Sequence, residues 1–227
     1  MQPNNILAVE YCKAILQQGS STKPLSIQRN GGYHDKTPDE NEPSATALRQ
    51  LLETGRPWQN FVPPETVDSL DGAVLHTIAH GEKAILARLR TMTDTEFEAL
   101  PYGSEGLWRK LMHAARQEAT LEDILNATKS KRYTRTRLDR MVMCAFLGIS
   151  KEILEAPVPY VRVLAFNDKG REILKKARQS GAFPNVGERQ NHPYQLLEDR
   201  CGNLYGLFAQ QPENPGAEDI RRVYYQA

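Results

Sequence analysis

Residues 58–156 carry one helix start signal after another, which leaves little room for a fold that is not mostly helical. Each signal is a proline, serine or threonine placed just before an amphipathic run, as at helix N-termini. The signals are Pro64, Thr93 with Glu96, Ser104, Thr120 with Asp123, and Ser150. A longer helix is predicted over residues 72–92, where apolar residues recur at helical spacing. Because no repeat period is evident, we expect an irregular helical bundle.

The stretches on either side of these helices mix helix and strand. At the start, a helix capped by Asn4 or Asn5 precedes residues 23–29, where apolar and polar residues alternate as in a strand. A helix and a strand with no earlier strand to pair with are half of an α/β unit, because parallel strands need neighbours. We therefore expect three parts, with boundaries after residues 57 and 156: residues 1–57, a helical domain over 58–156, and a small α/β region over 157–227.

The last of these parts has the weakest pattern. Residues 159–181 predict a strand, a turn at N-D-K-G and a helix, and the final I-R-R-V-Y-Y predicts a strand or a docked segment. Residues 185–195 and 210–217 predict loops, because they are rich in Pro, Asn, Gly and Gln.

A strongly basic segment, residues 129–140, enters an apolar helix. It holds six basic residues against one acid, whereas the whole chain balances 29 basic residues against 28 acidic ones. The six are Lys129, Lys131, Arg132, Arg135, Arg137 and Arg140. If the helix starts near Thr136, Asp139 completes a capping box, and the free amides and arginines attract phosphate. Tyr133 would then stack on an unpaired base, as in RNA loops. The alternative is a solvated basic face on an ordinary surface helix.

A second candidate anion site lies at the start of S-A-T-A-L-R, residues 44–49. Ser44 is a predicted N-cap, so the hydroxyls of Ser44 and Thr46, the first-turn amides and Arg49 would converge on one point. Such a cradle orients an anion with hydroxyls and neutralises it with an arginine. The alternative is a simple capped helix with Arg49 in solvent.

Composition excludes several classes of function. The net charge of +1 means that any nucleic-acid binding must be local, and three widely separated cysteines fit a reducing cytosol better than a disulfide frame or a zinc site. No apolar run approaches the roughly 18 residues that span a bilayer, and no signal peptide is present, so we expect a cytoplasmic protein without a membrane. His76 and His80 stand at i and i+4 without a third ligand, so we predict no metal site. We also find no complete set of catalytic residues.

Five motifs in order carry a resemblance to a known family. They are P-N-N-I-L-A-V-E-Y at 3–11, R-x-x-x-Y-H-D at 29–35, S-A-T-A-L-R at 44–49, S-E-G-L at 104–107 and K-x-K-R-Y-T-R-T-R at 129–137. Together they closely resemble the bacterial tRNA(Met) cytidine acetate ligases, a branch of the HIGH-type nucleotidyltransferase superfamily. The resemblance covers nearly the whole chain and is weakest after about residue 180.

The resemblance implies a specific reaction and a fold. The family activates acetate with ATP, and with Mg²⁺, as acetyl-adenylate, and passes the acetyl group to the N4 amine of the wobble cytidine of elongator tRNA(Met). It implies that residues 1–57 are the C-terminal remnant of a Rossmann-like nucleotide-binding domain and that the helical domain binds tRNA. The residues that it makes ATP-binding candidates are Asn4, Asn5, Arg29, Ser44, Thr46 and Arg49. The basic segment becomes the tRNA-binding candidate.

One departure from the family pattern stands out. Family members carry an H-x-G-H-type motif whose histidines stabilise the triphosphate, and no H-x-G-H occurs in these 227 residues. We therefore expect the C-terminal part of a ligase, arising from a truncation, a split gene or a shortened gene, that does not adenylate acetate alone. A separately encoded N-terminal half would then be a partner. The rival interpretations are a non-catalytic RNA-binding protein and a nucleotidyltransferase with another acceptor.

Overall fold

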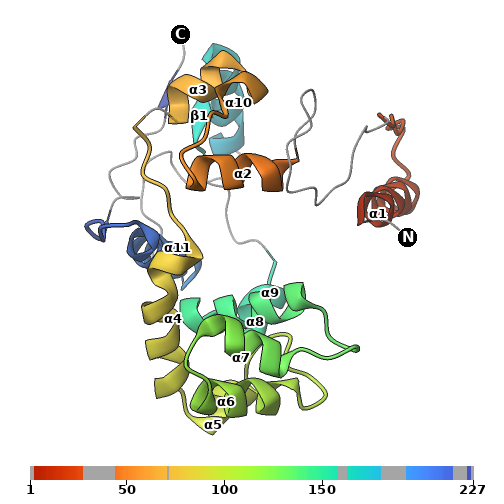
Figure 1. Ribbon diagram of the computed structural model, residues 1–227. Coiled ribbons are helices and arrows are strands. Elements are labelled where there is room, and N and C mark those ends of the chain that lie inside the picture. Colours follow the sequence, from red (N-terminus) through yellow and green to blue (C-terminus); the bar gives the residue numbers. More distant parts are fainter. Residues whose placement is uncertain are drawn as a thin grey trace. The chain divides into compact units, whose positions relative to one another are not determined.

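The computed structural model describes residues 3–27, 44–70, 72–157, 163–179, 193–216 and 224–225. These residues are mostly helical, which confirms the predicted fold class (Figure 1). Contacts divide the chain into two compact units, Met1–Ala73 and Val74–Ala227. The three-part division drawn from the sequence stays a prediction.

The first unit consists of short helices. They are α1 (Pro3–Gln17), α2 (Ala45–Glu53), the 3-10 helix η1 (Gln59–Phe61) and α3 (Pro64–Leu70). The predicted start at Pro64 is confirmed. The predicted caps of α1 are wrong, because Asn4 and Asn5 lie inside the helix that Pro3 begins. The predicted strand is also wrong over residues 23–27, which form no regular structure; residues 28 and 29 lie outside the described ranges.

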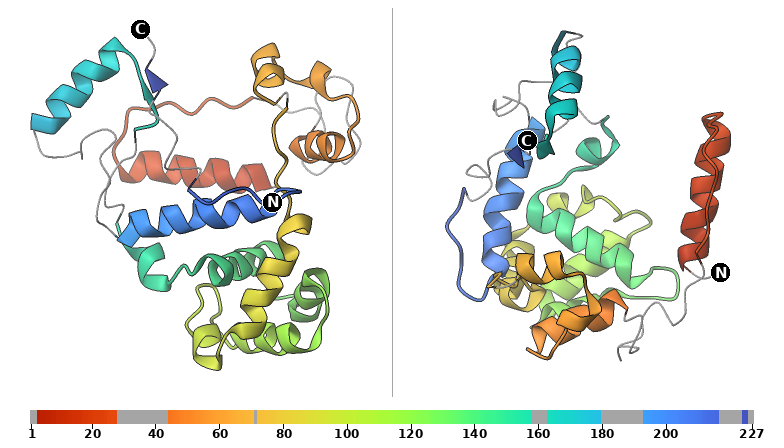
Figure 2. Two further views of the ribbon diagram at one scale, coloured as in Figure 1. Left: turned by 90° about the vertical axis from the view of Figure 1, so that its left-hand side faces the viewer. Right: turned by 90° about the horizontal axis from the view of Figure 1, so that it is seen from above.

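The second unit contains the helical core. Its first six helices are α4 (Ile78–Thr91), α5 (Asp94–Glu98), α6 (Leu107–Gln117), α7 (Leu121–Thr128), α8 (Arg135–Leu147) and α9 (Lys151–Glu155). They gather side by side in the two further views (Figure 2). The side chains at their centre share an exposure below 2%: Ile85, Leu89, Phe97, Leu107, Leu111, Ile124, Leu138 and Met141. The apolar stripes read from the sequence therefore do form one core.

Most of the predicted start signals act as caps. Thr93 and Glu96 form a capping box, the Thr120 hydroxyl accepts from the amide of Asp123, and the Ser150 hydroxyl accepts from the amide of Ile153. Each of these side chains satisfies an amide that the helix itself leaves unbonded.

Two predicted helix starts are wrong. α6 begins after Gly106 and not after Ser104, because Glu105 and Gly106 adopt left-handed backbone conformations, with φ of 61° and 78°. α4 begins at Ile78 rather than near residue 72, because the Thr77 amide donates to the carbonyl of Phe208, which holds the preceding residues out of a helix.

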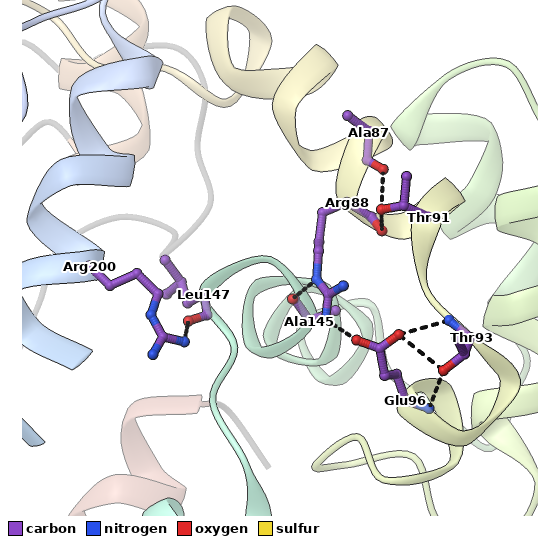
Figure 3. A network of polar contacts seen from close by, with 8 residues as sticks. All are labelled: Ala87, Arg88, Thr91, Thr93, Glu96, Ala145, Leu147 and Arg200. Atoms are coloured by element: carbon purple, nitrogen blue, oxygen red, sulfur yellow. Dashed lines mark hydrogen bonds and ion pairs between the residues drawn. The ribbon is translucent and has the colours of Figure 1, made fainter. Parts of the chain in front are cut away.

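A polar network joins α4, α5 and α8 (Figure 3). Arg88 donates to the Ala145 carbonyl at 3.2 Å and to Glu96 at 2.8 Å. The second oxygen of Glu96 accepts from the Thr93 amide and hydroxyl at 2.8 and 3.0 Å. The Thr93 amide, Arg88 and the Thr93 hydroxyl, in that order, hold the pKa of Glu96 at about 2 instead of 4.5.

The rest of the second unit mixes helix and strand. Its elements are β1 (Ala165–Phe166), α10 (Asp168–Gln179), α11 (Pro193–Tyr205), the 3-10 helix η2 (Gly206–Phe208) and β2 (Tyr224–Tyr225). β1 and β2 pair in parallel, so a strand lies at the end of each predicted segment. The first predicted strand is wrong at residues 163 and 164, which form no regular structure, and residues 158–162 and 217–223 lie outside the described ranges. The predicted N-D-K-G turn is instead the start of α10, because the Asn167 side chain accepts from the Gly170 amide at 3.0 Å. α11 already begins at Pro193, inside the predicted loop over residues 185–195.

Residues 205–213 dock on the start of α4. The Phe208 ring lies against Gly81 and meets the Phe146 ring edge-on at a centroid distance of 5.6 Å. His76 stacks on Tyr205 with centroids 4.1 Å apart. Among the helices of the described ranges, none is long and apolar enough to cross a bilayer.

Candidate functional site

The start of α2 has the features of an anion site. Ser44 is the N-cap, and its buried hydroxyl accepts from the Ala47 amide at 3.1 Å, as predicted. Thr46 is half-buried and Arg49, one turn further on, is exposed. Within the described ranges the amides of Ala45 and Thr46 have no hydrogen-bond partner. Two free amides and a nearby guanidinium would together hold one anionic oxygen group.

The other predicted nucleotide contacts do not join this site in the described ranges. Asn5 is an exposed residue of α1, and only the backbone of Asn4 is described. Arg29 and the R-x-x-x-Y-H-D motif at 29–35 lie outside the described residues. Their roles stay predictions.

The basic segment does enter a helix, and the N-cap of this helix lies two residues before the predicted one. α8 starts at Arg135 after the N-cap Thr134, and the Thr134 side chain makes no capping bond. The predicted capping box of Thr136 and Asp139 is wrong, because Thr136 lies inside the helix and Asp139 accepts from Arg135 Nε at 2.9 Å.

Tyr133 packs into the core of the protein. Its side chain is only 8% exposed and belongs to the core, and its hydroxyl donates to Glu105 Oε2 at 2.9 Å. Burial and this hydrogen bond, in that order, raise the pKa of the Tyr133 phenol. The predicted stacking on an unpaired base needs an open ring face, which Tyr133 does not present in this structure.

The same Glu105 also holds an arginine of the basic segment. Arg132 donates to Glu105 Oε1 at 2.8 Å, while most of the Arg132 side chain stays exposed. The guanidinium groups of Arg132 and Arg137 lie over the Tyr133 ring, 5.8 and 4.9 Å from its centroid. One carboxylate and one ring therefore fix the orientation of this part of the segment.

The guanidinium group of Arg135 is bound to carboxylates of the protein. It forms two parallel hydrogen bonds with Glu122 of α7, at 2.8 and 2.7 Å, besides its bond to Asp139. Hydrogen bonds to Glu122 and then Asp139 raise the pKa of Arg135, and the hydrogen bond from Arg135 lowers the pKa of Glu122. Arg135 thus ties α7 to α8 and has no donor direction left for a bidentate phosphate contact.

Arg137 holds the loop before α6. Its Nε donates to the Tyr102 carbonyl at 2.9 Å and its Nη2 to Ser104 Oγ at 2.8 Å. Tyr102 and Glu105 in this loop have φ of 65° and 61°, a conformation that non-glycine residues rarely adopt. The loop and the basic segment are therefore one hydrogen-bonded structure, although 28 residues separate Glu105 from Tyr133.

Three cations of the segment remain open to solvent. Lys129, Lys131 and Arg140 are exposed, and within the described ranges none of them forms an ion pair or side-chain hydrogen bond. Together with the exposed Arg132 they are the groups that a phosphate backbone would reach first. The carboxylates of Glu105, Glu122 and Asp139 are the site residues that the sequence reasoning did not find as partners of the basic segment.

The two histidines set aside on sequence grounds have packing roles. His76 Nε2 lies 2.9 Å from Glu213 Oε2, and His80 Nδ1 lies 3.2 Å from the Phe208 carbonyl. His76 precedes α4, so the two are not one turn apart on a helix. A search of the described ranges finds no cluster of three or more metal-ligating side chains.

Comparison with known proteins decides the family. The chain matches the family model of the HIGH nucleotidyl transferases over residues 1–219. The chain belongs to this family. Among curated nucleotidyl transferase relatives, the tRNA(Met) cytidine acetate ligase of Alkaliphilus metalliredigens is 36% identical over 90% of this chain and 54% of its own length. That of Leuconostoc citreum is 32% identical over 97% of this chain and 59% of its own length.

Two solved structures have a fold similar to that of this chain. The crystal structure of Thermotoga maritima TmcAL in its apo form I has a TM-score of 0.78 and 25% identity, over 99% of this chain and 60% of that one. A second form of TmcAL, bound with alpha-thio ATP, has a TM-score of 0.74 at 24% identity, over 100% of this chain and 60% of that one, which supports the fold. The present chain spans about half the length of the curated nucleotidyl transferase relatives that it matches.

Proposed function

We propose that this chain is part of an ATP-dependent tRNA(Met) cytidine acetate ligase. The observation that carries the proposal is its 36% identity, over 90% of its residues, to a protein of that name. The activity assigned to it is the formation of acetyl-adenylate from acetate and ATP, followed by N4-acetylation of the wobble cytidine of elongator tRNA(Met). Magnesium would accompany the ATP phosphates.

In this proposal the start of α2 binds phosphate oxygens of ATP. The free amides of Ala45 and Thr46 and the hydroxyl of Thr46 would position the phosphate, and Arg49 and Arg29 would neutralise its charge. Ser44 would act indirectly, because its hydroxyl already accepts from the Ala47 amide and so fixes the helix start. Asn4 and Asn5 are the proposed contacts of the nucleoside.

The basic segment would hold the tRNA, with some of its cations contacting phosphates and others positioning the segment. Lys129, Lys131, Arg132 and Arg140 are exposed and would contact phosphates directly. Arg135 is held by carboxylates and would position the segment. Arg137 and Tyr133 would serve the same end through the loop that contains Glu105.

No H-x-G-H motif occurs in the 227 residues, so the groups that stabilise the triphosphate during adenylation would have to come from other residues. We therefore expect this chain alone to bind tRNA but to form no acetyl-adenylate. Joined to the part of the Alkaliphilus metalliredigens ligase that this chain does not match, it should release AMP in an acetate-dependent way and place N4-acetylcytidine in elongator tRNA(Met), as mass spectrometry would detect.

The chimera also separates the rival functions. The Arg49→Ala variant of the chimera should lose AMP release while its tRNA affinity is unchanged. AMP release without acetylated tRNA would favour a nucleotidyltransferase with another acceptor. tRNA binding with no AMP release from a folded chimera would favour a non-catalytic RNA-binding protein. Acetate-dependent release of pyrophosphate by the 227-residue chain alone would refute our account of the missing motif, because adenylation of acetate releases pyrophosphate.

The tRNA interface needs its own test with a matched control. Lys131→Gln with Arg140→Gln removes two exposed charges that support no internal contact, so it should lower tRNA affinity. The slope of log affinity against log salt concentration should become shallower by about 1.4, since each single-strand phosphate contact contributes roughly 0.7. Lys83→Gln with Lys110→Gln removes two exposed charges from α4 and α6 and serves as the control. Equal losses in both variants would remove the basic segment from the proposal.

A further inference from the structure

A second basic surface lies on α10, far along the sequence from the basic segment. The helix carries five basic residues against two acidic ones within twelve positions. Three of them, Arg171, Lys175 and Arg178, recur at i, i+4 and i+7, so they share one face of the helix. The row spans about 10 Å at 1.5 Å per residue.

This face borders a groove with an apolar floor. The groove has a volume of about 430 Å³ and is lined by Phe166, Arg171, Leu174, Lys175 and Arg178. Phe166 and Leu174 are half-buried, whereas the three cations are exposed at the rim. We call this feature the α10 groove. A concave apolar floor under a cationic rim suits a ligand that has a flat apolar part and negative charge.

Local contacts hold the groove in shape. Gly170 lets α10 approach β1 closely, because a Cβ at this position would lie 2.9 Å from Phe166 Cβ. The Tyr225 ring packs on Phe166 at 5.4 Å, and the Arg171 guanidinium lies over the Tyr225 ring at 4.9 Å. The Tyr225 hydroxyl donates to Asp168 at 2.6 Å, so the carboxylate that begins the helix is engaged by the tyrosine.

The cations of the α10 groove differ in one respect from Arg132 and Arg135 of the basic segment. Within the described ranges, no carboxylate lies within ion-pair distance of Arg171, Lys175 or Arg178. Arg132 and Arg135, in contrast, are both bound to carboxylates. Among the described residues, an external anion could therefore bind the cations of the α10 groove without breaking an ion pair.

We propose that the α10 groove binds a single-stranded segment of RNA, with phosphates on Arg171, Lys175 and Arg178 and a base on the floor formed by Phe166 and Leu174. Single-strand binding combines a basic track with apolar or aromatic platforms, and this groove has both. An anionic lipid surface is flat and would leave the groove empty, so RNA is the better match. The inference rests on the proposed function only in taking RNA as the natural polyanion.

The test compares two charge-matched variants of the same helix in the full 227-residue chain. Lys175→Gln with Arg178→Gln removes two cations of the groove, and Lys169→Gln with Lys176→Gln removes two that do not line it. The probes are an elongator tRNA(Met) transcript and a short single-stranded RNA, measured by fluorescence anisotropy over a salt series. We expect the groove variant to bind the single strand roughly 10-fold to 25-fold more weakly at about 0.1 M salt, with a slope lower by about 1.4. The control variant should stay close to the parent chain.

Two outcomes would overturn the proposal. Equal weakening in both variants would show a general electrostatic effect of α10 without a role for the groove. Stronger binding to vesicles with anionic lipid than to RNA, lost in the groove variant, would assign the surface to membranes. Lysine acetylation footprinting gives an independent readout, in which bound RNA should protect Lys175 and leave Lys169 reactive; protection of neither lysine contradicts the proposal.

The outcomes also distinguish this inference from the proposed function. If the groove variant binds normally while the Lys131→Gln with Arg140→Gln variant binds weakly, the α10 groove is refuted and the tRNA interface stands. If neither variant affects binding, the RNA-binding part of the proposed function fails as well.

Discussion

Replacing Gly81 by alanine should expose how the chain after α11 is held on the helical core. A Cβ at residue 81 would lie 2.6 Å from two carbons of the Phe208 ring and 2.9 Å from a third. Carbon atoms normally pack at about 3.5–4.0 Å, so the ring would have to move by about 1 Å. The added methyl group is small, but the space that it needs is filled.

The Phe208 ring has little freedom to move away from residue 81. Its carbonyl accepts from the Thr77 amide at 2.8 Å, which fixes the backbone, and its ring meets Phe146 edge-on. The side chain is 6% exposed. Overpacking of this kind costs about 1–3 kcal/mol, and full expulsion of the ring would cost about 3–5 kcal/mol. Alanine in place of glycine inside a helix returns about 1 kcal/mol, so overpacking leaves a net loss of up to about 2 kcal/mol.

Urea denaturation followed by circular dichroism would measure this loss, and a double-mutant cycle would assign it. In a Phe208→Ala background the clash is absent, so Gly81→Ala should be neutral or stabilising by up to about 1 kcal/mol. If Gly81→Ala stabilises the parent chain as well, helix propensity alone is at work and the docking of Phe208 on α4 is refuted.

Three further outcomes follow from contacts described above. Glu96→Gln should flatten the pH dependence of stability between about pH 4.5 and 2, because the bonds that hold the pKa of Glu96 at about 2 stabilise the fold above its ordinary value of 4.5 and are lost as the pH falls; an unchanged acid limb in denaturant titrations would contradict this. Tyr133→Phe should lower the denaturant midpoint by removing the bond to Glu105, and any weaker RNA binding should accompany that loss of stability; weaker RNA binding at unchanged stability would show that the hydroxyl contacts RNA instead. Ser44→Ala should lower the opening free energy of α2 by about 1 kcal/mol in hydrogen exchange, whereas Ser44→Asp should preserve it.

Capping chemistry explains which helix boundaries could be predicted from the sequence. Ser44, Thr93, Thr120 and Ser150 each bond to the amide three residues further on, so the residues that decide each boundary are neighbours in the sequence. Ser104 failed as a cap because a left-handed turn held by residues some thirty positions away, including Arg137, follows it. No local pattern reveals such a contact.

The basic segment shows the same limit for the candidate site. The sequence showed the positive charge of the segment. It did not show which cations face solvent and which are paired with carboxylates of the protein. Nothing in the sequence distinguishes Arg135 from the other arginines. Only the structure shows that it pairs with Glu122, thirteen positions earlier. Tyr133 likewise resembles a stacking residue by composition, and only packing shows that it belongs to the core.

The carboxylates within the basic segment also bear on discrimination among polyanions. A phosphate that approaches Arg135 must displace Glu122, and one that approaches Arg132 meets the nearby carboxylate of Glu105, so part of the attraction is cancelled before contact is made. Heparin and random duplex DNA, which offer charge at high density without matching spacing, should therefore gain little from this surface. Selectivity for one folded RNA would come from the four solvent-facing cations, whose spacing only a complementary backbone can satisfy all at once.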